Sequence, residues 1–256
     1  IKTTYVLPVT IKSVEGIGVL QSAKTYYYVF RGASLINVVC NISRNRAYPD
    51  FKNDSKFNNL TENTMEILFK ANSFPNTLNT LMGIESNYLL RIGDATIPNN
   101  QLQVATSVNN CTSADLQLES GKWYHVAVAF NKGNVKVYIN GVEKLSGSTG
   151  KSSVSLGAKH TNEEDGSRCF WVGYSYKDDR YFDGVVSEVR IWNRALTAEE
   201  IQATNHFYTI EPESEGLIAY WKFDEGSGTV AKDYSVSGYD LTIEKEPKWE
   251  SVSLPQ

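Results

Sequence analysis

The stretch "GKWYHVAVAFNKGNVKVYINGVEK" (Gly121–Lys144) alternates in the way expected of a strand that is covered on both faces. In an extended chain its side chains form two rows on opposite faces. One row holds Tyr124, Val126, Val128 and Phe130, and the other holds Trp123, His125, Ala127 and Ala129. Both rows are largely apolar. "NKGN" and "NG" then mark tight turns, because Asn and Gly tolerate positive φ. The stretch therefore predicts a three-strand antiparallel meander.

Similar short segments recur along the chain, separated by polar, Gly-rich or Asn-rich segments. Such segments are typical of strands. No strand–helix alternation accompanies them, which argues against an α/β fold. We expect an all-β antiparallel sandwich. Besides the meander, its strands are expected at Leu35–Cys40, Thr64–Lys70, Leu78–Ile84, Tyr88–Ile92, Leu102–Ser107, Val154–Leu156, Cys169–Tyr174, Phe182–Asn193, Leu217–Phe223 and Leu241–Ile243.

One helix and one ribbon complete the expected elements. "LTAEEIQAT" carries Thr197 as an N-cap and Glu200 three residues later, which predicts a short helix with a capping box. Near the start of the chain, Tyr5–Ile11 and Tyr26–Phe30 read as two strands of a β ribbon. A ribbon of that size is too small to be stable alone.

Charge and cysteine usage exclude some classes of protein. Lysine and arginine total 25 and aspartate and glutamate 29, for a net charge of −4. We see no clustered basic face, so a nucleic-acid partner is not expected. Cys40, Cys111 and Cys169 form no C-x-x-C motif, which argues against a zinc site. We favour three buried free thiols over one disulfide plus one free thiol.

Catalytic patterns are not found in the sequence. The E-x-D-x-x-E spacing of jelly-roll glucanases does not occur, and Glu163, Glu164 and Asp165 read as a solvated loop. We interpret Glu188 and Arg190, on one face of a strand, as a structural ion pair. His125 reads as a core histidine, whereas His160 and His206 look isolated and lack metal-ligand spacing. We therefore do not expect an enzyme.

Three segments carry a resemblance to a known family. The meander resembles the centre of laminin-G-like (concanavalin A-like) jelly rolls, and "YFDGVVSEVRIWNRALTAEEI" (Tyr181–Ile201) resembles their closing strand and following helix. "GLIAYWKFDEGSGTVAKDYSVSGYDLTI" (Gly216–Ile243) resembles the segment that usually opens such a domain. Because that segment lies near the C-terminus here, we expect a circularly permuted jelly roll.

The order of these segments resembles that of Bacteroidetes surface proteins, in which a small β domain precedes the jelly roll. The resemblance implies that residues 1–31 are the end of such an N-terminal domain and that residues 32–256 form the jelly roll. It also implies a cell-surface or secreted protein, with an outer-membrane lipoprotein suspected. Contact with a membrane would then depend on a lipid anchor that lies outside this sequence.

The resemblance further implies a possible structural calcium ion, since related jelly rolls often hold one with carboxylates and backbone carbonyls. Asp224, Asp233 and Asp240 are the candidate ligands, with Glu225 beside them. The alternative is that these aspartates serve their own turns. Relatives often carry an acidic residue where this chain has Ser187, which removes one possible ligand.

A glycan site needs aromatic rings for the apolar sugar face beside polar groups that read the hydroxyls. "FWVGYSYKDDRYFDG" (Phe170–Gly184) is the richest such stretch. Its candidate ligand-binding residues are Tyr174, Tyr176, Asp178, Asp179, Arg180 and Tyr181. The alternative is that Tyr181 and Phe182 anchor the closing strand while the charges are merely solvated.

The function expected from these features is non-catalytic binding at a cell surface, lectin-like and directed at an oligo- or polysaccharide in glycan capture. A module for protein interaction, adhesion or architecture is the alternative. A glycoside hydrolase of the same fold is a weaker third hypothesis, because it requires two carboxylates about 5 to 9.5 Å apart in one cleft.

Overall fold

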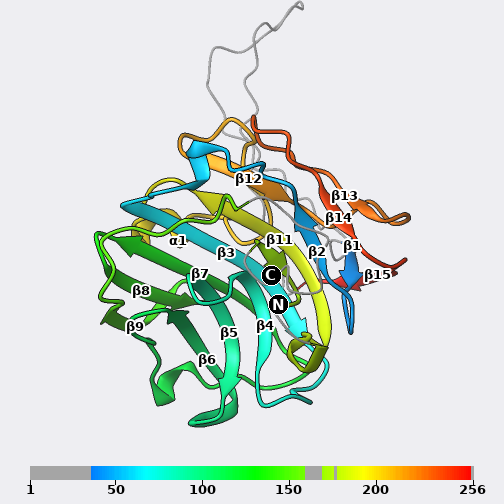
Figure 1. Ribbon diagram of the computed structural model, residues 1–256. Coiled ribbons are helices and arrows are strands. Elements are labelled where there is room, and N and C mark those ends of the chain that lie inside the picture. Colours follow the sequence, from blue (N-terminus) through cyan, green and yellow to red (C-terminus); the bar gives the residue numbers. More distant parts are fainter. Residues whose placement is uncertain (1–35, 159–168, 176–177, 255–256) are drawn as a thin grey trace, which may run out of the picture.

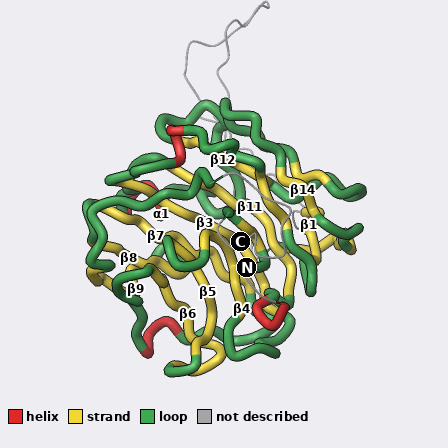
Figure 2. The backbone as a smooth tube through the Cα atoms, in the orientation of Figure 1, coloured by secondary structure: helices red, strands yellow, loops and turns green. Residues whose placement is uncertain are grey.

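The computed structural model describes residues 36–158, 169–175 and 178–254 (Figure 1). Several sequence predictions fall outside these ranges: the N-terminal ribbon and the domain assigned to residues 1–31, His160, Glu163 to Asp165, and Tyr176. Strands and the loops that connect them make up most of the described body, and helical turns are confined to short segments (Figure 2). The predicted all-β sandwich is confirmed.

The strands form two antiparallel sheets. The first sheet has the order β15 (Lys248–Ser253), β1 (Ile36–Asn41), β11 (Gly184–Trp192), β3 (Glu62–Ala71), β7 (Trp123–Asn131), β8 (Asn134–Ile139) and β9 (Val142–Ser148), and β12 (Leu217–Trp221) also pairs with β11. The second sheet has the order β13 (Val230–Ala231), β14 (Leu241–Ile243), β2 (Ala47–Pro49), β10 (Trp171–Val172), β4 (Asn79–Ile84), β5 (Tyr88–Asp94) and β6 (Ile97–Thr106).

The predicted meander is β7, β8 and β9, and its two rows of side chains separate as expected. Val126, Val128 and Phe130 are fully buried in the main core between the sheets. Ala127 and Ala129 of the opposite row lie in a second apolar cluster on the outer face of the first sheet. Both faces of this sheet are therefore covered, which explains why neither row of β7 is polar.

The C-terminal part of the chain completes the sandwich. β12 pairs with β11, with Trp221 opposite Val189, and β15 pairs with β1 along its whole length. Trp221 is fully buried and packs against Phe51 and Phe170. The strand expected at Leu217–Phe223 is confirmed over Leu217–Trp221. The permuted order relative to other jelly rolls remains a prediction.

The structure departs from the expected strands in several places. Val154–Leu156 is not a strand, and Val154 makes an isolated bridge with Leu60. Cys169–Tyr174 forms only the two residues of β10. The short strands β2, β13 and β15 were not expected. β2 and β13 have only three and two residues, and β15 alternates weakly in burial, so none of them carries a clear apolar period.

The predicted helix is α1 (Ala198–Ile201), and both hydrogen bonds of its capping box are formed. Three 3₁₀ turns accompany it: η1 (Ser55–Phe57), η2 (Ala114–Leu116) and η3 (Asp178–Arg180). Residues 193–216, the cover segment, carry α1 across the outer face of the first sheet, where Leu196 and Ile201 pack on Ala127, Ala129 and Tyr138. Among the described residues, no helix is long and apolar enough to span a bilayer.

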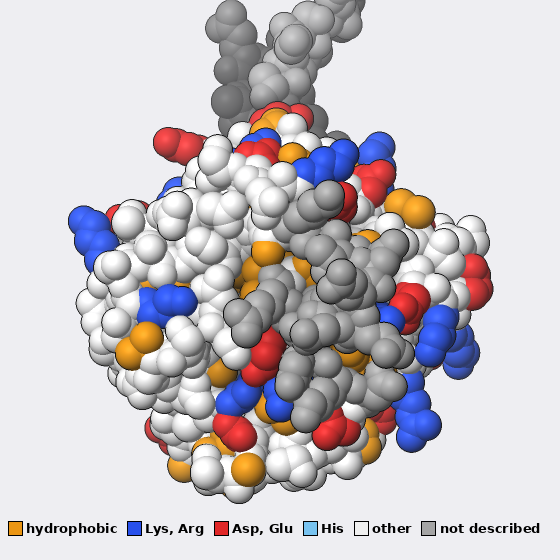
Figure 3. Space-filling model, in the orientation of Figure 1, with side chains coloured by type: hydrophobic (Ala, Val, Ile, Leu, Met, Phe, Trp, Pro, Cys, Tyr) orange, Lys and Arg blue, Asp and Glu red, His pale blue; other side chains and the backbone are white. Residues whose placement is uncertain are grey.

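Two composition-based expectations can be compared with the structure. All three cysteines are free and buried, which confirms the preferred interpretation. On the face seen in Figure 3, basic and acidic side chains are interspersed.

Candidate functional site

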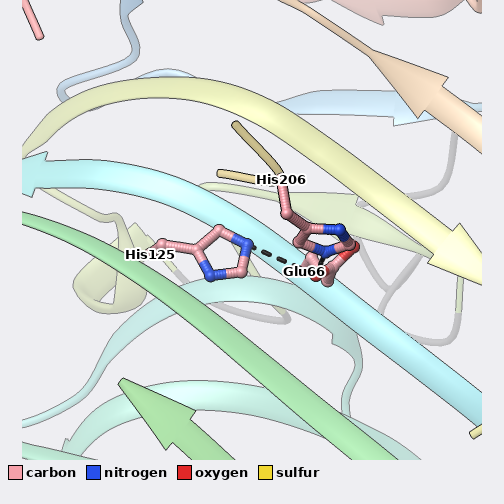
Figure 4. Close-up of side chains that lie close together, drawn as sticks. All are labelled: Glu66, His125 and His206. Atoms are coloured by element: carbon pink, nitrogen blue, oxygen red, sulfur yellow. Dashed lines mark hydrogen bonds and ion pairs between the residues drawn. The ribbon is translucent and has the colours of Figure 1, made fainter. Parts of the chain in front are cut away.

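Glu66, His125 and His206 meet beneath the cover segment (Figure 4). β3 supplies Glu66, β7 supplies His125, and the turn after α1 supplies His206. Oε1 of Glu66 lies 2.6 Å from Nε2 of His206 and 3.3 Å from Nε2 of His125. The side chains of Glu66 and His125 are fully buried, and that of His206 is 5% exposed. His206 was expected to be isolated; that expectation was wrong, because the cover segment folds it back over the sheet.

Arg190 extends the cluster toward a second buried carboxylate. Its guanidinium donates to Glu188, lies 3.7 Å from Oε2 of Glu66, and donates to the carbonyl of His206 at 2.6 Å. Nε1 of Trp192 donates to Oε2 of Glu66 at 2.7 Å, and the hydroxyl of Tyr220 donates to Glu188 at 2.6 Å. The predicted structural ion pair of Glu188 and Arg190 is confirmed.

The burial of these groups shifts their proton affinities. Burial alone would raise the pKa of Glu66, but its contacts with the two histidines hold it well below its ordinary value. Burial lowers the pKa of His125, against the opposing effect of Glu66. Burial raises the pKa of Glu188, although Arg190 and Tyr220 oppose it. Two buried carboxylates thus share one arginine and two histidines.

Glu66, His125 and His206 also form a possible metal-ligand set, with three donor atoms within 4.8 Å of one another. Nitrogen and oxygen ligands in a tetrahedral zinc site lie about 2.0 to 2.1 Å from the ion, so they stand about 3.3 to 3.4 Å apart. The Glu66–His206 distance of 2.6 Å is a hydrogen-bond length, and the other oxygen of Glu66 is engaged by Trp192. The arrangement therefore fits a hydrogen-bonded network that fastens the cover segment to the sheet better than it fits a metal centre.

A cleft of about 590 Å³ opens elsewhere, beside Tyr181. We call it the Tyr181 cleft. It is lined by Ser43, Arg44, Ser73, Pro75, Asn76, Tyr181, Phe182, Asp183 and Lys245. These residues come from four separate segments, which meet where β1 and β3 end and β11 begins. An aromatic ring, an amide, hydroxyls, a carboxylate and two cations therefore surround one cleft.

Hydrogen bonds fix the walls of this cleft. The amide of Asn76 donates to the carbonyl of Tyr181 at 3.0 Å, and the hydroxyl of Ser43 donates to Asp183 at 2.7 Å. Ser73 donates to the other oxygen of Asp183. Backbone bonds from Ile42 to Gly184 and from Asn72 to Asp183 tie the segments together. These bonds hold the walls of the cleft in one arrangement.

Asp183 is held in its charged form. Burial alone would raise the pKa of this carboxyl, but hydrogen bonds from Ser73, Ser43 and Asn72 and the charge of Arg44 hold it below its ordinary value. The carboxylate therefore acts as a fixed acceptor that orders the hydroxyls around it.

An aromatic band leads away from the cleft along the outer side of the second sheet. Tyr181 contacts Tyr174 with ring centroids 4.8 Å apart, and Tyr174 contacts Trp171 at 5.2 Å. The guanidinium of Arg46 lies 4.7 Å from the ring centre of Tyr174 and 5.2 Å from that of Trp171. Tyr174 and Trp171 are each only 4% exposed, so Tyr181, which is half-buried, is the ring of this band that lines the cleft.

The structure separates the six predicted ligand-binding residues. Tyr181 lines the cleft, and Tyr174 packs behind it. Arg180 turns the other way and donates to Glu85 at 2.9 Å, while the side chain of Asp179 is 78% exposed. Asp178 begins η3, and Tyr176 lies outside the described residues. A role in binding stays a prediction for each of them.

The predicted calcium ligands do not converge. Among the described residues, Asp224, Asp233 and Asp240 do not bring three carboxylate oxygens within 4.8 Å of one another. Asp233 accepts from the backbone amides of Tyr220, Ser235 and Tyr239, each at 2.9 Å. This is the turn-stabilising role that the sequence left as the alternative, and it leaves Asp233 poorly suited to a cation.

Glu225 offers a better oxygen for a cation than Asp233 does. Its Oε2 is buried without a hydrogen-bond partner, while its Oε1 accepts from the amide of Lys232. Burial raises its pKa, and the negative charges of Asp224 and Asp240 add to that effect. A bound cation at this position would satisfy Oε2 and offset the repulsion between the carboxylates, so calcium remains a prediction for this turn.

Most residues of the Tyr181 cleft were missed at the level of sequence. Asp183 follows Tyr181 by two positions, and the strand that begins at Gly184 marks it as the end of a loop. No local sequence pattern marks Arg44, Asn76 and Lys245 as neighbours of Tyr181, because they come together only when distant loops meet in the folded chain. For the buried network, Glu66 was a signal, since it is a charge within the otherwise apolar run "MEILF" (Met65–Phe69).

The sequence pattern of the laminin-G-like family, in the concanavalin A-like lectin/glucanases superfamily, matches residues 45–202, which is more than half of the chain. The chain belongs to this family. Among functionally curated proteins, no sequence matches it. The laminin-G-like fold is also shared with a solved structure from Bacteroides ovatus ATCC 8483, a protein proposed to bind carbohydrate. The identity is 26% and the TM-score 0.74, over 93% of this chain and 66% of that one. This chain thus spans slightly less than two thirds of that protein.

Two further solved structures show weaker similarity, on which no argument rests. A heptameric pentraxin of Limulus polyphemus is 14% identical, with a TM-score of 0.46, over 68% of this chain and 84% of that one. Domain 4 of an extracellular arabinanase from Geobacillus stearothermophilus, solved with arabinotriose, is 22% identical, with a TM-score of 0.46, over 64% of this chain and 74% of that one.

Proposed function

We propose that this laminin-G-like domain is a non-catalytic glycan-binding module and that the Tyr181 cleft is its binding site. The observation that carries the proposal is the composition of the cleft, in which Tyr181 stands beside the amide of Asn76 and the hydroxyls of Ser43 and Ser73. Pyranose rings present apolar C–H faces to aromatic rings, while amides, hydroxyls and charged groups read their hydroxyls. The similarity to the Bacteroides ovatus protein supports the same class of ligand.

The proposal of binding without catalysis rests on the carboxylates of the cleft. Among the described residues that line it, Asp183 is the one carboxylate, and both of its oxygens accept hydrogen bonds from serines. Glycosidic hydrolysis usually uses two carboxylates on either side of the scissile bond. A single engaged carboxylate suits the recognition of hydroxyl groups.

Protein interaction is the second candidate. It would be favoured by a contiguous exposed apolar patch of several hundred Å². In the described ranges, the large exposed apolar side chains are Val108, Val142, Val230 and Val236, which lie on different strands and loops. This distribution favours a glycan over a protein partner.

The experiment is a glycan-array screen of the purified chain, with and without a calcium chelator, followed by calorimetry with the best ligand. Tyr181→Leu removes the planar ring and keeps an apolar side chain, so binding should weaken at least about 10-fold. Tyr181→Phe keeps the ring and should bind within about 3-fold of wild type. Equal binding by the Leu variant, or no binding to any glycan under either condition, would refute the proposal.

We further propose that the domain acts at the cell surface, as part of a secreted protein or an outer-membrane lipoprotein that captures glycans. The support is the resemblance of the motif order to surface proteins of Bacteroidetes. Detection of the protein on intact cells by an antibody, before and after surface proteolysis, would test this location.

A further inference from the structure

We propose that the Tyr181 cleft selects glycans that carry a carboxylate, that is, uronic acid units, and that Arg44 and Lys245 are the residues that read this charge. The proposal rests on the proposed function and specifies the ligand class of the same site. Arg44 and Lys245 both line the cleft and both are exposed, so their charged groups are accessible to a ligand.

The first argument is that Arg44 acts on Asp183 through its charge but forms no salt bridge with it among the described residues. The other arginines in the described ranges, Arg46, Arg91, Arg180, Arg190 and Arg194, all pair with a carboxylate. Arg44 makes no salt bridge within the described part of the chain, although it lines a cleft that contains a carboxylate. A guanidinium forms two parallel hydrogen bonds with a carboxylate, and Arg44 retains that capacity.

The second argument is that Asp183 offsets only part of the positive charge of the cleft. Its two oxygens accept from Ser43 and Ser73, so its hydrogen-bonding capacity is turned toward the wall. The described lining then holds two cations against this one carboxylate. An anionic sugar offsets the remaining positive charge, whereas a neutral sugar leaves it to water.

The third argument is that a buried side chain joins the backbone segments that carry the two cations. Asn45, which is 5% exposed, donates to the carbonyl of Lys245 at 2.8 Å and accepts from its amide at 3.2 Å. The amide of Arg44 donates to the carbonyl of Phe182 at 3.4 Å. Asn45 and Lys245, which are 200 positions apart in the chain, are thus joined at the rim of the Tyr181 cleft. A site for a charged sugar requires such support.

The test compares uronate oligosaccharides (galacturonate, mannuronate–guluronate and glucuronoxylan series) with their carboxyl-reduced counterparts, which keep the linkage and lose the charge. Calorimetry is run with wild type, Arg44→Gln, Lys245→Gln and the control Lys132→Gln, which removes another exposed charge, at the β7–β8 turn. Melting temperatures verify that each variant is folded.

We expect at least one uronate series to bind at least about 10-fold more tightly than its reduced form. Arg44→Gln should weaken uronate binding by about 10- to 100-fold, because charge-assisted hydrogen bonds are lost. The same variant should bind the carboxyl-reduced form with an affinity within about 3-fold of wild type. Lys132→Gln should change the affinity for neither ligand form. Raising the salt concentration should reduce the difference in affinity between the uronate and its carboxyl-reduced form.

Equal binding of the charged and reduced forms, or binding only to neutral or sulfated glycans, would overturn the uronate assignment while leaving glycan binding intact. Uronate binding that survives both Arg44→Gln and Lys245→Gln would also overturn it. Failure to bind any glycan would instead refute the proposed function itself.

Discussion

Nε2 of His206 lies 2.6 Å from Oε1 of Glu66, although the two residues are 140 positions apart in the chain. This contact joins the cover segment to the middle of β3 in a fully buried setting. Because Glu66 also accepts from Trp192 and faces Arg190, one carboxylate organises charged and polar groups from three parts of the chain.

Glu66→Ala should destabilise the domain by about 3 to 5 kcal/mol, because it leaves His125, His206 and the indole N–H of Trp192 buried without their carboxylate partner. Glu62→Ala, at the start of the same strand, should change the free energy of unfolding by no more than about 0.5 kcal/mol. Urea denaturation followed by tryptophan fluorescence measures both values. If Glu66→Ala lowers the free energy of unfolding by less than about 1 kcal/mol, the buried network around Glu66 does not hold the cover segment on the sheet.

Stability should depend on His125 below neutral pH. Burial lowers the pKa of His125 from its ordinary value of 6.5, so the folded state keeps this group neutral while the unfolded chain takes up a proton. The contribution of neutral His125 to the free energy of unfolding is therefore intact above about pH 6.5 and is lost as the pH falls below that value. The depressed pKa of Glu66 acts with the same sign, from its ordinary value of 4.5 downward.

The contribution of His125 can be separated from that of other groups by a difference measurement. Glu188, Asp233 and Glu225 have raised pKa values, which act with the opposite sign as the pH falls. The free energy of unfolding of wild type minus that of His125→Gln removes these common terms. This difference should decrease below pH 6.5 by up to about 1.4 kcal/mol per pH unit. A difference that stays constant between pH 7 and 5 would contradict the assignment.

Gly83→Ala should be strongly destabilising. Gly83 has a φ of +123°, and a Cβ there would lie 2.3 Å from the carbonyl oxygen of Tyr88. Gly121 is the matched control, since it also has a positive φ (+77°) but has nothing within 4 Å of its Cβ position. Gly121→Ala should cost about 1 to 2 kcal/mol for the left-handed backbone alone, and Gly83→Ala about 2 kcal/mol more because of the clash. Equal effects in chemical denaturation would mean that the β4–β5 pair can move apart.

The three thiols should resist modification in the native state. Burial raises the pKa of Cys40 and of Cys111, and the thiolate is the reactive form. A colorimetric thiol reagent at pH 8 should react with three thiols per chain in denaturant and with almost none in buffer. Fewer than three in denaturant without reductant would indicate a disulfide.

The strands of the sandwich were predictable where local pattern and burial agree. β7 alternates between the main core and the outer cluster, and both of its rows are buried, so its sequence alone predicts its place. The capping box of Thr197 and Glu200 is equally local. β13 and β15 lacked such a pattern, because short strands near a sheet edge bury few side chains and gain their order from the neighbouring strand.

The candidate sites were predictable only in part. The sequence by itself determined the two-layer sandwich, its helix start and the aromatic character around Tyr181, since these depend on side-chain period and on contacts between near neighbours. Only the tertiary structure decided that His206 meets Glu66, and that Arg44 and Lys245 share a cleft with Tyr181. The reason is that antiparallel strands return the chain to the same edge after long excursions, so loops far apart in sequence become neighbours that no local pattern encodes.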